Sequence, residues 1–116
     1  DRRQRQMCKE TGLGQIIKLK PEAIAEYERL HANVWPEVLA TIHACNIHNY
    51  SIFRNGTWLF AYFEYSGDDF AADMQKMAAD PRTREWWRYT DPLQEALVER
   101  APGEWWATMK EVFHTD

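Results

Sequence analysis

Apolar and polar positions along the chain follow two periods, and these periods predict its strands and helices. Residues 14–20 form a short run with β-branched residues at its centre, which stops at Pro21 and predicts a strand. Apolar residues then recur at helical spacing from residue 24 to residue 45. Pro36 lies inside this pattern and cannot donate a helical hydrogen bond, so we expect it to kink or restart the helix.

A β-hairpin is predicted next along the chain. Two strand-like runs, residues 46–53 and 57–65, flank Asn55-Gly56, a pair typical of a tight hairpin turn. Both runs have apolar side chains on both faces, so we expect the hairpin to be covered on both sides. Strict alternation along the first run predicts that His48, Tyr50 and Ile52 share one side.

The second half predicts two more helices and a final strand. Residues 67–69 can cap a helix that ends at Asp80-Pro81, residues 82–89 continue in helical pattern, and residues 105–114 suggest a last strand. This order predicts an α+β, ferredoxin-like βαββαβ protomer with an antiparallel sheet and helices on one face. Because the other face stays open, we expect a homodimer joined sheet to sheet.

Composition and charge narrow the class of protein. The chain has 116 residues, and the polar, basic residues 1–12 are expected to form a flexible tail before a single domain at 13–116. A net charge of −4 argues against a nucleic-acid partner, and no apolar run approaches the roughly 20 residues of a membrane span. Two cysteines without a CxxC pair predict a reducing, cytoplasmic setting and no zinc site.

Two groups of residues could carry chemistry. Tyr27, His31 and Trp35 recur on one helix face, as a buried aromatic stripe or as the wall of a site with a group that titrates near neutral pH. His48 and Tyr50 could pack in the sheet or offer hydrogen bonds to the same cavity.

The two tryptophan pairs could likewise be packing residues or part of a binding site. Trp86 and Trp87 point about 100° apart on a helix, so we expect one in the core and the other against a ligand or a partner subunit. Trp105-Trp106 pose the same question, and indole rings suit both a subunit interface and the apolar face of a sugar.

Four motifs occur in order along the chain: Glu26-Tyr27-x-x-x-His31-x-x-x-Trp35-Pro36-Glu37, His48-Asn49-Tyr50, Trp86-Trp87 and Glu111-Val112-Phe113. Together they resemble the L-rhamnose mutarotase family, from about residue 14 to the C-terminus. His114 follows the last motif where the family tends to have an aromatic residue, and residues 67–80 and 101–106 look like those of a subgroup, so L-fucose is an alternative substrate to L-rhamnose.

The resemblance implies a dimeric α/β barrel that interconverts the α and β anomers of a 6-deoxy-hexose, an isomerase without metal or organic cofactor. By resemblance, His31 is the proton donor, and Tyr27, Tyr50, Trp86 and Trp87 contact the monosaccharide. His48 is kept as a supporting residue or alternative base, and Trp35 as a supporting residue. The rival interpretations are a non-catalytic sugar-binding module and another dimeric-barrel enzyme, such as a small monooxygenase.

Overall fold

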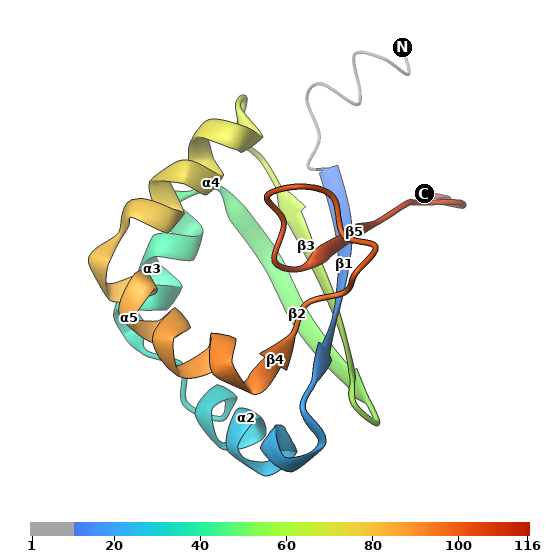
Figure 1. Cartoon of the computed structure of the whole chain (residues 1–116). Helices are drawn as coiled ribbons and strands as arrows, with labels where there is room; N and C mark the ends of the chain where they lie inside the picture. The colour runs from blue at the N-terminus through green and yellow to red at the C-terminus, as the bar shows by residue number, and fades with distance from the viewer. Residues whose placement is uncertain (1–10) are drawn as a thin grey trace.

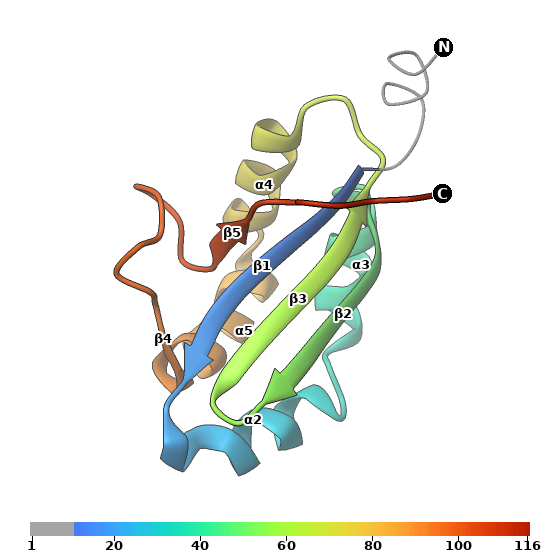
Figure 2. The ribbon, with the colours of Figure 1, turned by 90° about the vertical axis from the view of Figure 1, so that its right-hand side faces the viewer.

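A curved antiparallel sheet with helices packed on one side forms the body of the protein (Figures 1 and 2). The structure is a computed structural model and describes residues 11–116, so residues 1–10 of the expected tail lie outside the described part. The strands are β1 (Thr11–Leu19), β2 (Ile47–Asn55), β3 (Trp58–Tyr65), β4 (Gln94–Glu95) and β5 (Ala107–Met109). The helices are α2 (Ile24–His31), α3 (Pro36–Ala44), α4 (Phe70–Ala79) and α5 (Pro81–Thr90), with short 3-10 turns η1 (Pro21–Ala23) and η2 (Asp91–Leu93).

The sheet topology confirms the ferredoxin-like prediction. The strand order is β2-β3-β1-β4, and the helices lie between the strands in sequence. The prediction of one last strand at 105–114 was wrong in its extent. The edge of β1 is shared: β4 pairs with Lys18 and Leu19, and β5 pairs with residues 14–16. β4 occupies the edge of β1 at residues 18 and 19 and so limits where β5 can begin, while residues 110–116 at the other end lie outside any strand.

Local sequence signals account for most element boundaries. The hairpin turns at Gly56, whose positive φ of 61° suits glycine. Pro36 restarts the helix, because the residue before a proline avoids helical backbone and Trp35 is extended. Asp69 and Asp80 each accept a backbone N–H in the first turn of α4 and α5. β1 begins at Thr11, so the last two residues of the expected tail belong to a strand.

A β-bulge in β2 changes which side chains face the helices. His48 pairs with Glu64, but the register shifts before Ser51, and Asn49 there has a φ of 48°. Ile52 then pairs with Ala61, whose position on β3 differs from that of Glu64 by an odd number. His48 and Ile52 therefore lie on opposite faces, and the prediction that they share one with Tyr50 was wrong.

The core lies between the sheet and the helices. One cluster contains Ile17, Leu19, Tyr27 and Leu59, and a second contains Ile47, Phe63 and Tyr65. We call this side of the sheet the inner face and the opposite side the outer face. Among residues 11–116 there is no helix with the length and apolar composition that a membrane crossing requires.

Candidate active site

Helix α2 presents its histidine to an aromatic wall. The rings of Tyr27 and His31 stack with centroids 4.1 Å apart, because residues four apart share one helix face. Trp86 of α5 meets the other side of the His31 ring edge-on at 5.4 Å. Tyr27 and Trp86 are buried, whereas His31 keeps part of its surface accessible. The structure thus brings together three of the residues singled out from the sequence.

The hydrogen bonding of His31 fixes its tautomer. Its Nδ1 lies 2.9 Å from the backbone carbonyl oxygen of Tyr27, which can only accept, so Nδ1 carries a proton. In the neutral imidazole Nε2 is therefore unprotonated, and it is the nitrogen that gains and loses a proton. Burial lowers the pKa of His31 below 6.5, although the bond to the Tyr27 carbonyl partly opposes this shift.

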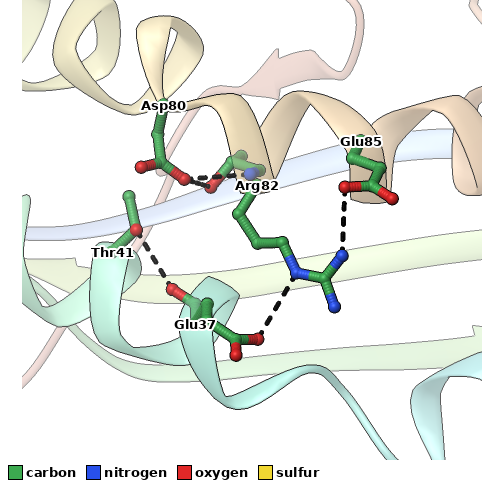
Figure 3. A network of polar contacts seen from close by, with 6 residues as sticks. Glu37, Thr41, Asp80, Arg82 and Glu85 are labelled. Carbon is green, nitrogen blue, oxygen red and sulfur yellow. Dashed lines mark hydrogen bonds and ion pairs between the residues drawn. The ribbon is translucent and has the colours of Figure 1, made fainter.

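Trp35 and Arg82 extend the wall and connect α3 to α5. Trp35 meets Trp86 edge-on at 5.1 Å, and the guanidinium carbon of Arg82 lies 3.8 Å from the centroid of the Trp35 ring. Arg82 also bonds Glu37 at 3.4 Å and Glu85 at 3.0 Å (Figure 3). These exposed ion pairs add little stability, but they keep the guanidinium near the indole.

Tyr50 enters the same region from β2. Its ring packs edge-on against Phe63 at 5.5 Å, which places it on the inner face. Tyr50 exposes 41% of its surface, yet burial raises the pKa of its hydroxyl to about 12. The exposed fraction describes the whole residue, whereas the pKa shift reflects the surroundings of the hydroxyl oxygen. The pKa of Tyr27 is also raised, first by burial and next by the neighbouring Tyr50, so both phenols stay protonated at neutral pH.

A groove opens beside His31 between α2 and β2. Its volume is about 340 Å³, within the range of roughly 300–1,000 Å³ typical of small-molecule sites. Tyr27, His31 and Leu59 line it from within, and Glu28 bonds Arg54 at 2.6 Å along its side. A larger hollow of about 480 Å³ follows the loop at residues 98–105 and contains no histidine. Within residues 11–116 no three His, Cys, Asp or Glu side chains converge as a metal site.

The two remaining predicted site residues are His48, which contacts Ser66, and Trp87, which is partly buried. His48 donates to or accepts from the Ser66 hydroxyl at 2.7 Å, and its ring lies 6.1 Å from that of His43, so its contacts are at the far end of the strand. Trp87 is partly buried, whereas its neighbour Trp86 is in the core, as the helical geometry predicts for one of the pair.

Sequence reasoning missed Gln94, a buried residue that bonds both Tyr27 and Trp105. A lone glutamine after a proline carries no signal of this role.

Comparison with known proteins decides the family. A family model described as L-rhamnose mutarotase matches residues 13–115. The chain belongs to the L-rhamnose mutarotase family. Membership confirms the expected sugar mutarotase, and with it a carbohydrate isomerase.

Relatives within the L-rhamnose mutarotase family carry two sugar names. The L-rhamnose mutarotase of Lactiplantibacillus plantarum is 33% identical over 90% of this chain and 97% of its own length. The L-fucose mutarotase of Xanthomonas campestris is 39% identical over 84% of this chain and 82% of its own. The crystal structure of the L-rhamnose mutarotase from Formosa agariphila has the same fold, with a TM-score of 0.71, 23% identity, and coverage of 91% of this chain and 99% of that one.

Proposed function

We propose that this mutarotase interconverts the α and β anomers of a 6-deoxy-hexose, L-rhamnose or L-fucose, with His31 moving the proton at the ring oxygen. The observation that carries the proposal is the placement of His31. Its Nδ1 is bound to the backbone, its Nε2 has no hydrogen bond to a group among residues 11–116, and the ring lies beside a groove, stacked on Tyr27 and edge-on to Trp86.

The reaction needs proton transfers and a pocket. Ring opening breaks the bond between C1 and the ring oxygen; the ring oxygen gains a proton from His31, and the anomeric hydroxyl loses one to water as the aldehyde forms. Rotation about C1–C2 and closure with the reverse transfers give the other anomer. The His31 imidazolium supplies the proton to the ring oxygen and recovers it on closure. A positioned acid or base of this kind typically contributes about 10²–10⁴-fold.

The surrounding aromatic residues would hold the sugar. Tyr27 and Tyr50 can hydrogen-bond sugar oxygens as neutral phenols, the form that tyrosine has at neutral pH and that their raised pKa values favour further. Trp86 is already packed against His31 and Trp35, so Trp87 is the indole that remains for the apolar face or the C6 methyl of the sugar.

The test is anomer exchange measured by saturation-transfer NMR, with L-rhamnose and L-fucose compared in the presence and absence of the protein. We expect faster exchange with at least one of the two sugars. Sugar binding without faster exchange would instead support a binding module, and an oxygen-consuming activity would support a monooxygenase. Either result, with exchange at the rate in water, refutes the proposed reaction.

We also propose a homodimer formed through the outer face. By register this face carries Phe53, Trp58 and Tyr62, which expose 62%, 39% and 42% of their surfaces. The segment after β5 leaves the sheet on the side away from the helices and carries Val112 and Phe113, both largely exposed (Figures 1 and 2). Isolated subunits rarely expose so many large apolar side chains on one side, and a second copy would bury them.

Light scattering coupled to size exclusion tests the dimer. Tyr62→Asp places a charge at the centre of the outer face and is expected to give a folded monomer. Leu39→Asp is the matched control, because Leu39 is similarly exposed but lies on α3, on the helical side. A dimer that survives Tyr62→Asp but not Leu39→Asp would place the interface on the helices.

A buried free thiol at Cys45 supports the further proposal that the protein works in the reducing cytoplasm. Localisation of a tagged chain in cell fractions tests it.

A further inference from the structure

Gln94 is a buried amide that connects Tyr27 to the loop before β5. It opens β4, the strand beside β1, and only 5% of its surface is exposed. Its Nε2 lies 3.2 Å from the Tyr27 hydroxyl, and its Oε1 lies 2.7 Å from the indole Nε1 of Trp105. Segments 67 residues apart in the chain thus meet in one hydrogen-bonded line.

Trp105 determines which way the amide of Gln94 points. An indole N–H can only donate, so the atom of Gln94 that faces it must be the carbonyl oxygen. The reverse orientation would place two donors 2.7 Å apart. The NH₂ group therefore faces Tyr27 and donates to its hydroxyl oxygen.

The hydroxyl proton of Tyr27 is consequently left for another partner. The amide nitrogen of Gln94 cannot accept it, and within residues 11–116 no other group accepts a hydrogen bond from this hydroxyl. Tyr27 also lines the groove beside His31. A sugar oxygen with a free lone pair is an acceptor of the right kind for it.

We propose that Gln94, oriented by Trp105, is a positioning residue that makes Tyr27 a hydrogen-bond donor to the sugar. This inference rests on the proposed mutarotase function. It also gives the loop at residues 96–106 a role, because Trp105 reaches the active site through Gln94 without touching the sugar. The Gln94 N–H opposes the rise in the Tyr27 pKa that burial causes, as expected of a donor to the phenol oxygen.

A double-mutant cycle separates this role from a structural one. In wild-type protein, Gln94→Met and Tyr27→Phe are each expected to lower kcat/KM for anomer exchange by about three- to tenfold, the loss of one hydrogen bond. If Gln94 acts through the Tyr27 hydroxyl, Gln94→Met causes no further loss in the Tyr27→Phe background. A residue that only supports the fold would cost the same factor in both backgrounds, and that additive result overturns the proposal.

Trp105→Phe provides a milder variant with a matched control. It removes the indole N–H but keeps an aromatic ring, and we expect a loss similar to that of Gln94→Met with thermal stability near wild type. Trp106→Phe is the same change one residue later, in a side chain that packs against the core cluster containing Tyr27 and whose indole N–H has no hydrogen bond to a group among residues 11–116. A loss with Trp106→Phe as large as with Trp105→Phe would mean that packing matters and would refute the role of the N–H.

The rate of anomer exchange with wild-type protein shows whether the role of Gln94 alone has failed or the proposed function as well. Catalysis by wild-type protein with an additive cycle refutes the role of Gln94 alone. Exchange at the rate in water, with wild-type protein, refutes the proposed function and this inference with it.

Discussion

The lowered pKa of His31 predicts how the reaction depends on pH. If the imidazolium donates the proton, kcat/KM follows the protonated fraction of the free enzyme. That fraction is full only below the folded-state pKa, which burial places under 6.5. Above it we expect kcat/KM for anomer exchange to fall about tenfold per pH unit, so the rate at pH 5.5 exceeds the rate at pH 7.5. His31→Ala should lose about 10²–10⁴-fold and flatten the profile.

The assay is saturation-transfer NMR at a sugar concentration well below saturation, from pH 5 to pH 8, corrected for exchange in buffer. His43→Ala is the matched control, because His43 is exposed on α3 and does not line the groove. It should keep both the rate and the profile. A kcat/KM that rises with pH through this range would make His31 a base in its resting form and refute donation from the imidazolium.

The lowered pKa of His31 also predicts that the stability of the fold increases with pH, whereas the activity decreases. Because the folded-state pKa of His31 lies below the unfolded value of 6.5, the unfolded chain binds the proton more readily in this window. The stability due to neutral His31 is complete above pH 6.5 and is lost as the pH falls through the folded-state pKa. Urea unfolding should show a shallower loss for His31→Gln than for wild type, while activity increases over the same interval.

Two further substitutions test the fold. Gly67→Ala would drive its new Cβ into the Tyr65 hydroxyl, and we expect a loss of about 1–3 kcal/mol in urea unfolding. Gly14→Ala meets only the flexible end of Met109 at 3.1 Å and should cost clearly less, so equal losses would contradict this reasoning. Asp80→Ala removes the N-cap of α5 and should lower the melting temperature without changing the helix content, which circular dichroism can check.

Strong local signals allowed much of the fold to be predicted. Asn55-Gly56 specifies the hairpin, Pro36 restarts a helix, and Asp69 caps the next. Each acts within a few residues through backbone geometry, so one sequence is sufficient. Tyr27 and His31 were found for the same reason, since one helical turn brings them together.

What the sequence did not reveal depends on distant pairing. The bulge at Asn49 is visible only against β3, and the division of the β1 edge between β4 and β5 follows from where two separate segments meet it. Gln94 could not be predicted for the same reason, because its hydrogen-bond partners lie 67 and 11 residues away in the chain.

The bulge at Asn49 has a consequence for sequence comparison and for engineering. Successive side chains of a strand point to opposite faces of the sheet. The extra residue between His48 and Ser51 shifts this alternation by one position. Deleting Asn49 would return β2 to strict alternation and leave His48 on the outer face and Tyr50 on the inner face, because Tyr50 alone would then oppose Phe63. An alignment with a strand that lacks the bulge needs a gap at this point, because without it inner positions are compared with outer ones. A library that varies His48 and Tyr50 together would alter two opposite surfaces at once.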